Sequence, residues 1–249
     1  MKAGNMKKYV FDFIVALAAL IFALVLGIIV LKIAIDRKGD FFYKNTNQTQ
    51  TSTTDTTKKK TNTNRKVADE STGTYWIGDS RFVGMDKVVD IKSTDHYYLE
   101  AKIGQGLLWF KKTALPKIEK TRKKNTALKK WRYVICLGVN DLGNLDNYID
   151  EYKELTAGDS TIELILVSVN PVKNYPTIKN SDIENFNKKL HDACDENNWY
   201  YIDSYSKLMD LGYTTTDGLH YDNDTYQDIY DIIEEGLSDY EQEKAASKN

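Results

Sequence analysis

The chain has 249 residues, of which 41% are hydrophobic and 28% are charged. The formal net charge is −2, but residues 74–249 contain 22 Lys and Arg against 30 Asp and Glu, a net of −8, so residues 1–73 carry +6. This acidic balance argues against a nucleic-acid-binding function for the larger part of the chain.

An apolar segment comes first. Residues 13–31 are 19 consecutive residues without a charge, and at 1.5 Å per residue a helix of that length nearly matches the roughly 30 Å hydrocarbon core of a bilayer. A cleaved signal peptide is the alternative, but its apolar region is usually about 7–15 residues long and ends at a small-residue cleavage site. We therefore predict that residues 1–38 are an N-terminal tail with one transmembrane anchor.

The charges around this segment bear on its orientation. Basic residues lie on both sides of it, so the positive-inside rule is nearly balanced. The very short basic tail favours a cytoplasmic N-terminus, which predicts that the bulk of the chain is extracytoplasmic.

Residues 39–73 have the composition of a linker. The stretch 45–64 is almost entirely Thr, Asn, Gln, Ser and Lys, with no large apolar residue. Such a stretch buries too little surface to offset its ordering entropy. We predict a disordered tether with a typical reach of roughly 30–35 Å, followed by a folded domain over residues 74–249.

Within that domain, short apolar runs alternate with helical periodicity. The strand candidates are residues 74–78, 97–101, 132–137, 163–169 and 199–202, and the main helix candidates are 148–155, 183–194 and 225–240. Ser181 or Asp182 is the predicted N-cap of the second helix. This alternation predicts an α/β sandwich with a mainly parallel sheet, and Cys136 and Cys194 are expected to be buried free thiols.

Three short motifs carry side chains suited to nucleophilic catalysis: Gly78-Asp79-Ser80, Gly138-Val139-Asn140-Asp141 and Asp217-Gly218-Leu219-His220. A serine becomes a good nucleophile when a histidine, oriented by a carboxylate, takes its proton. The other two histidines are poor candidates: His96 begins the second strand at the end opposite the expected site, and His191 lies beside a buried helix stripe. His220 follows Asp217 by three residues, a spacing that allows a hydrogen bond between them.

These motifs, with a glycine after the second strand, resemble the four blocks of the SGNH/GDSL hydrolase superfamily over about residues 74–237. The resemblance implies a flavodoxin-like three-layer α/β/α sandwich with no metal or organic cofactor. It implies that Ser80 is the nucleophile, His220 the base and Asp217 its orienting acid. The oxyanion donors would be the Ser80 NH, the Gly104 NH and the Asn140 side chain, although a Gly-x-Asn-Asp segment is also a common turn.

Several positions near these motifs have more than one interpretation. Gly104 and Gly106 are alternative oxyanion donors, and the spacing from the strand favours Gly104. Arg81 stands where many relatives have an apolar residue, so either it contacts substrate or it serves packing or a surface ion pair. Trp109 is either a pocket wall or a core residue, and Gly106 and Asp141 are further candidates for substrate contact. The chain lacks the Gly-x-Ser-x-Gly elbow of the other α/β-hydrolase class.

The sequence thus predicts a membrane-anchored, extracytoplasmic serine esterase that removes acyl groups, O-acetyl above all, from cell-envelope carbohydrate. The alternatives are an O-acetyltransferase that uses the same triad, a lipid esterase, and a non-catalytic envelope-binding domain. The basic segment 111–132 is either a solvated helix and loop or a patch that contacts an anionic polymer or lipid.

Overall fold

The structure is a computed structural model that describes residues 71–247. The predicted anchor at residues 13–31 and nearly all of the predicted tether lie outside the described residues. Among residues 71–247, no helix combines the length and the apolar character needed to cross a bilayer.

One parallel sheet forms the centre of the domain. Its strands run in the order β2-β1-β3-β4-β5, and every neighbouring pair is parallel. The strands are β1 (Thr72–Gly78), β2 (Tyr97–Ala101), β3 (Lys130–Cys136), β4 (Ile162–Val167) and β5 (Tyr200–Ile202). The predicted parallel sheet is confirmed, and each strand begins and ends within two residues of its predicted position.

The predicted tether extends too far toward the domain. Thr72 and Gly73 belong to β1, where they pair with Lys130 and Trp131 of β3. A Cβ at position 73 would lie 2.6 Å from the Trp131 ring, so glycine allows this close approach. The pairing partner is 58 residues away in the chain, which is why local composition did not reveal the start of the strand.

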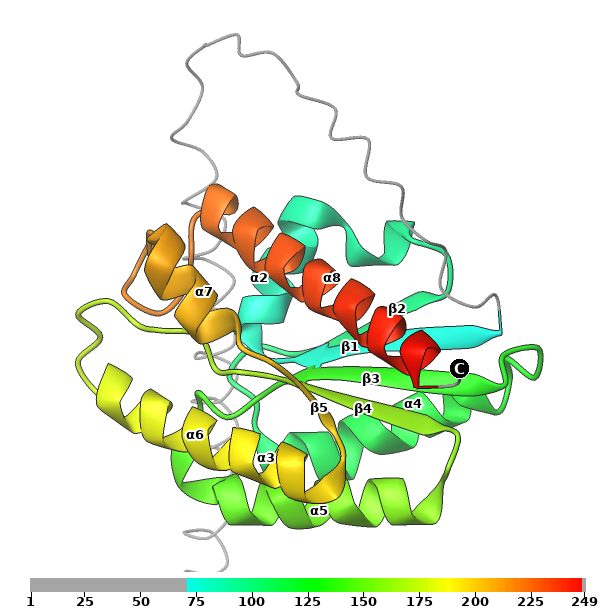
Figure 1. Ribbon diagram of the computed structural model, residues 1–249. Helices are drawn as coiled ribbons and strands as arrows, with labels where there is room; N and C mark the ends of the chain where they lie inside the picture. The colour runs from blue at the N-terminus through cyan, green and yellow to red at the C-terminus, as the bar shows by residue number, and fades with distance from the viewer. Residues whose placement is uncertain (1–70, 248–249) are drawn as a thin grey trace, which may run out of the picture. The chain divides into compact units, whose positions relative to one another are not determined.

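Helices cover both faces of the sheet (Figure 1). One face packs against α3 (Leu107–Trp109), the π-helical turn η2 (Phe110–Ala114), α4 (Leu115–Arg122), α5 (Leu145–Gly158) and α6 (Asn180–Asn197). The other packs against α2 (Ser80–Val89), α7 (Ser204–Leu211) and α8 (Asn223–Ala246). Two short 3-10 turns, η1 (Ile91–Ser93) and η3 (Leu142–Asn144), complete the helical segments.

Alternate side chains of β1 belong to different cores. Tyr75 and Ile77 lie in the core under α3–α6, whereas Trp76 lies in the core under α2 and α8. A strand buried on both faces has the near-continuous apolar sequence expected of a parallel sheet. The predicted three-layer α/β/α sandwich is confirmed, and both cysteines are buried free thiols as predicted.

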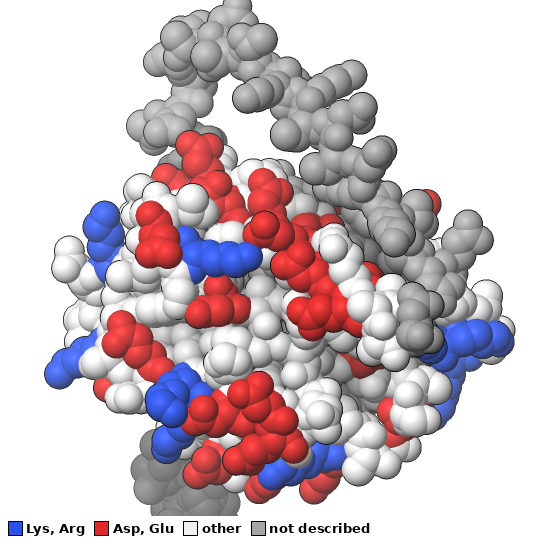
Figure 2. All heavy atoms as spheres, viewed as in Figure 1, with Lys and Arg blue, Asp and Glu red and all other residues white. Residues whose placement is uncertain are grey.

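Two helix predictions need correction. Helix α6 begins at Asn180 after Lys179, without a side-chain cap, so neither Ser181 nor Asp182 is its N-cap. The Asn180 side chain pairs with the backbone of Val172 in both directions, at 2.8 and 3.0 Å, and thereby fixes where the helix starts. Helix α8 is longer than predicted and contains eight acidic residues against one lysine, which gather on the surface seen in Figure 2.

Candidate active site

Ser80 lies where β1 ends and α2 begins. Asp79 is the N-cap of α2, and its Oδ1 accepts a hydrogen bond of 2.9 Å from the backbone N–H of Arg81. A Cβ on Gly78 would lie 2.6 Å from the Phe82 ring, so only glycine allows the chain to turn this closely into the helix. Ser80 is therefore the first residue of a helix, where backbone N–H groups have no partner within the helix.

The structure brings Ser80, His220 and Asp217 into one hydrogen-bonded series. His220 Nε2 lies 2.8 Å from Ser80 Oγ, and His220 Nδ1 lies 2.7 Å from Asp217 Oδ2. With a proton on Nδ1, the imidazole donates to the carboxylate and its Nε2 accepts from the serine hydroxyl. This arrangement allows His220 to take the serine proton.

Asp217 is held as a carboxylate. Its second oxygen, Oδ1, accepts hydrogen bonds from the backbone N–H groups of Leu219 (2.9 Å) and His220 (2.8 Å). Partial burial acts to raise the pKa of Asp217, but these hydrogen bonds and the one from the imidazole outweigh it and leave the pKa below its usual value. The carboxylate therefore remains charged and orients the imidazole.

Gly218 fixes the turn between the acid and the base. Its φ is +89°, and a Cβ there would lie 2.7 Å from the carbonyl oxygen of Lys173. The same two segments are joined by a hydrogen bond of 2.9 Å from the Lys173 N–H to the Gly218 carbonyl. The Asp217–His220 loop is thus attached to the loop that follows β4.

The candidate oxyanion donors lie on loops beside Ser80. Asn140 follows β3, and its Nδ2 donates to the Gln105 carbonyl at 2.8 Å and to Asp79 Oδ2 at 3.4 Å. Gly104 has a φ of +67°, and beyond its two chain neighbours no heavy atom of residues 71–247 lies within 4 Å of the position a Cβ would occupy. The two loops and the nucleophile therefore meet at the carboxyl edge of the sheet, where open α/β sheets bind ligands.

Asp141 and Gly106 hold these loops together, and their role as substrate contacts stays a prediction. The Asp141 carboxylate accepts hydrogen bonds from the Leu107 N–H (2.9 Å), the Tyr148 hydroxyl (2.9 Å) and the Asn144 amide (3.2 Å). A Cβ on Gly106 would lie 2.3 Å from Asp141 Oδ2. The carboxylate is engaged within the protein, and glycine is needed for the contact.

Arg81 and Trp109 are both buried, in agreement with the packing alternative for each residue. Arg81 is 3% exposed and Trp109 is 6% exposed. Trp109 packs in the core under α3–α6, because the helix that it ends lies against the sheet. The exposed apolar side chains of this region are instead Ile103 and Leu108, which flank the candidate oxyanion loop and are 45% and 74% exposed.

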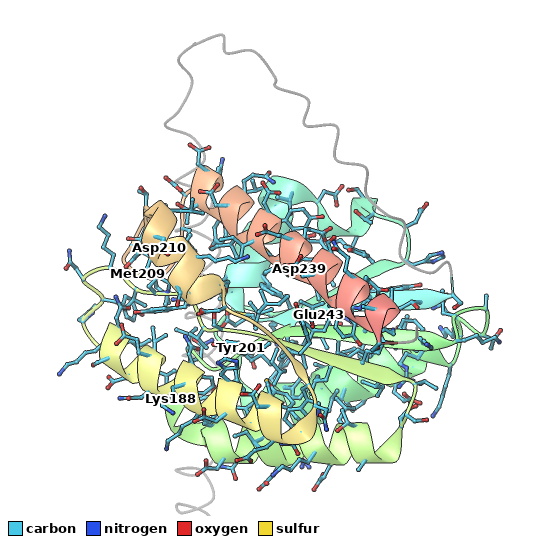
Figure 3. The ribbon with its side chains drawn as sticks, in the orientation of Figure 1. Lys188, Tyr201, Met209, Asp210, Asp239 and Glu243 are labelled. Atoms are coloured by element: carbon cyan, nitrogen blue, oxygen red, sulfur yellow. The ribbon has the colours of Figure 1, made fainter. Side chains whose placement is uncertain are left out.

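Other exposed apolar and titratable groups lie away from these loops. Met209, which Figure 3 labels, and Leu211 are exposed on α7. His96 directly precedes β2, and His191 on α6 stacks on Tyr201 with ring centroids 4.4 Å apart. Neither histidine takes part in the hydrogen-bonded series, in agreement with their predicted positions. Among residues 71–247, no group of three or more His, Cys, Asp or Glu side chains is arranged to hold a metal ion.

Asp79 has a structural role that the sequence motifs do not predict. Its carboxylate is fully buried, and burial raises its pKa while the nearby Arg81 charge and the Arg81 N–H counteract that rise. It caps α2 and also contacts the Asn140 amide, so it links the nucleophile to a candidate oxyanion donor. An aspartate between a strand and an apolar helical stretch is a recognisable N-cap signal.

Comparisons with known proteins support the fold. No family model and no curated protein matches the chain, but solved structures do. The catalytic domain of peptidoglycan O-acetyltransferase A from Streptococcus pneumoniae matches with a TM-score of 0.52 and 16% identity, over 69% of this chain and 96% of that one. An acetylxylan esterase from Geobacillus stearothermophilus matches with a TM-score of 0.50 and 10% identity, over 69% and 96%. The chain shares the fold of these two domains. A candidate acylhydrolase from Bacteroides fragilis has the same fold, with a TM-score of 0.50 and 18% identity over 70% of this chain and 88% of that one.

The turn at Gly218 can be tested against a second glycine of positive φ. Gly212 has a φ of +83°, and in the described part of the chain only its two neighbours come within 4 Å of its Cβ position. Alanine there therefore introduces backbone strain alone, about 1–3 kcal/mol. We expect Gly218→Ala to lower the free energy of unfolding by about 1 kcal/mol or more beyond Gly212→Ala, because a Cβ also meets the Lys173 carbonyl. Equal losses in chemical denaturation would show that this contact does not constrain the loop.

Proposed function

We propose that the chain is an SGNH/GDSL-type serine hydrolase that cleaves carboxylic esters. The observation that carries this proposal is the hydrogen-bonded series from Asp217 through His220 to Ser80. Its three members come from the loop before α8 and from the start of α2. The location at the carboxyl edge of the parallel sheet, on the hydrolase fold, supports the same assignment.

The proposed reaction proceeds through an acyl-enzyme. Ser80 Oγ attacks the ester carbonyl carbon while its proton passes to His220 Nε2, and the carbonyl oxygen becomes an oxyanion. Collapse of this intermediate breaks the bond to the alcohol oxygen, which receives the proton from His220. Water then attacks the acyl group in the same way, its proton passes to His220, and the acid leaves as Ser80 regains its proton.

Three donors are proposed to hold the oxyanion. The Ser80 N–H lies at the first position of α2, where the helix dipole favours negative charge. Gly104 offers its backbone N–H at a position whose Cβ side is open. Asn140 offers the side-chain N–H that makes the longer of its two hydrogen bonds, 3.4 Å to Asp79 Oδ2. Donors that are in place before the reaction stabilise the transition state because they need not reorganise.

The proposed substrate is an O-acyl ester, O-acetyl above all, of cell-envelope carbohydrate. Support comes from the predicted anchor and tether, which would hold the domain near an envelope surface, and from similar structures whose names refer to a peptidoglycan O-acetyltransferase and an acetylxylan esterase. The former also supports a second candidate function, in which a sugar hydroxyl replaces water as acceptor of the acyl group. We further propose that residues 13–31 anchor the chain and that the hydrolase domain is extracytoplasmic.

Covalent labelling tests the nucleophile. A fluorophosphonate probe should label the wild-type protein and fail to label Ser80→Ala. Ser206→Ala is the matched control, since Ser206 is an exposed serine on α7, and it should label as the wild type does. Labelling of Ser80→Ala would contradict the assignment.

Turnover of a model acetyl ester tests the base and the acid. His220→Ala should lower kcat by about 10³–10⁶-fold, and Asp217→Asn by less, because the base remains but loses its orientation. His191→Ala, which changes an exposed histidine of α6, should leave kcat unchanged. A fall of only a few-fold for His220→Ala would exclude the proposed triad.

Product analysis separates the two candidate functions. Acetylated wall polymer incubated with the enzyme should release free acetate, and adding a sugar acceptor should not divert the acetyl group. Transfer to the acceptor in place of release would establish the acetyltransferase. Hydrolysis restricted to long-chain lipid esters would overturn the carbohydrate substrate and would give a role to exposed Ile103 and Leu108.

Protease treatment of intact cells tests the location. Cleavage between residues 39 and 71 by an added protease, without cell lysis, is expected for an extracytoplasmic domain. Protection of this segment until the cells are broken would contradict the proposed orientation.

A further inference from the structure

Arg81 is a buried charged residue next to the candidate nucleophile. It is the second residue of α2, directly after Ser80, and is 3% exposed. A buried positive charge at a helix N-terminus is unfavourable, because desolvation and the helix dipole both oppose it. An apolar side chain would fill this position at lower cost, so the guanidinium must be retained for what it contacts.

The Arg81 guanidinium contacts two segments that are distant in the chain. Its NH1 donates a hydrogen bond of 2.7 Å to the carbonyl of Asn170, in the loop after β4. Its central carbon also lies 5.4 Å from the ring centroid of Tyr221, within cation–π distance. Tyr221 directly follows His220, so Arg81 joins the segment of the nucleophile to the segment of the base.

Tyr221 closes this arrangement into a triangle. Its hydroxyl donates to the carbonyl of Pro171, the residue after Asn170. Arg81, Tyr221 and the Asn170–Pro171 backbone therefore contact one another pairwise, and all are buried. Asn170 is itself held by the Ser204 hydroxyl, which donates to Asn170 Oδ1 at 2.7 Å, so the triangle is attached to the core.

We propose that Arg81 is a positioning residue that fixes the distance between Ser80 and His220 through Tyr221. This inference rests on the proposed hydrolase function and extends it to a residue that the triad does not include. Arginine suits the role because its planar guanidinium can stack on a ring and donate in its own plane at once, which a lysine ammonium cannot do. Nε and NH2 of Arg81 have no hydrogen-bond partner among the described residues. The Arg81 charge also favours the charged form of the buried Asp79 carboxylate, and Tyr221→Leu separates the two effects because it removes the ring contact and keeps the charge.

Arg132 provides a matched control. It is also a buried arginine, 2% exposed, with an aromatic ring at 5.3 Å and carboxylate partners Glu163 and Glu241. It lies near the amino end of β3, the end of the sheet opposite Ser80. Its removal should affect stability as removal of a buried charge does, without reaching the proposed site.

The experiment compares Arg81→Met, Arg81→Lys, Tyr221→Leu, the Arg81→Met/Tyr221→Leu double variant and Arg132→Met in the full chain. Hydrolysis of a model acetyl ester is measured at a temperature where each variant is folded by circular dichroism. Arg81→Met should lower kcat by about 10²-fold, as expected for a small misplacement of reacting groups, with KM within about threefold. Arg81→Lys should recover only part of this loss, and Arg132→Met should keep the wild-type kcat.

The double variant tests whether Arg81 acts through Tyr221. If it does, the double variant should lose no more activity than the more damaged single variant, because both remove the same contact. Multiplication of the two losses would overturn the proposed route. An Arg81→Met protein that is less stable but retains wild-type kcat would overturn the positioning role altogether.

A second readout does not depend on activity. The proton on His220 Nδ1, hydrogen-bonded to Asp217, is followed by nuclear magnetic resonance and assigned by its loss in His220→Gln. It should shift or disappear in Arg81→Met and stay in place in Arg132→Met, and an unchanged signal in Arg81→Met would overturn the proposal. A wild-type protein that shows this signal but cleaves no ester would refute the proposed function. The comparison of the signal between Arg81→Met and Arg132→Met would still decide whether Arg81 places His220.

Discussion

The hydrogen bond between His220 Nε2 and Ser80 Oγ is the contact on which the rest of the site depends. It joins residues 140 positions apart in the chain at 2.8 Å. No local structure can provide such a contact. It requires a sheet whose strands all end at the same edge and a helix that begins at the serine. It also requires a loop late in the chain that places the histidine beside that serine. The parallel order β2-β1-β3-β4-β5 places the end of β1 beside the ends of β2 and β3, so the candidate oxyanion loops reach the same point.

Buried polar side chains hold this edge in place. Asp79 caps the helix that begins at Ser80, and Asp141 connects the two candidate oxyanion loops. Arg81 spans from that helix to the loop after β4. Each such group is costly to bury and is therefore hydrogen-bonded or paired. The cost is concentrated where loops converge, whereas the interior of the sheet is formed by apolar side chains such as Trp76 and Ile165. The domain thus combines an apolar scaffold with a polar edge whose geometry is fixed before substrate arrives.

The sequence was sufficient for the fold and for the identity of the converging residues. Apolar runs revealed all five strands, most clearly β3 and β4, because strands buried on both faces have a near-continuous apolar sequence. The spacing of Asp217 and His220 revealed their hydrogen bond because a three-residue separation is a local property. Neither apolar runs nor local spacing could predict the side-chain contacts of Arg81, Asp141 and Trp109. Their side chains are engaged by partners that lie 89 positions away for Arg81 and 34 for Asp141, and by a helix packed on the sheet for Trp109.

The central claim is that Ser80 carries an acyl group during turnover. The most direct measurement is mass spectrometry of the protein quenched in acid within milliseconds of mixing with an activated acetyl ester. One acetyl group should appear on the peptide that contains Ser80, accumulate in a burst, and disappear as the ester is consumed. Hydrolysis without any acetylated Ser80 peptide, or with the acetyl group on another residue, would contradict the account.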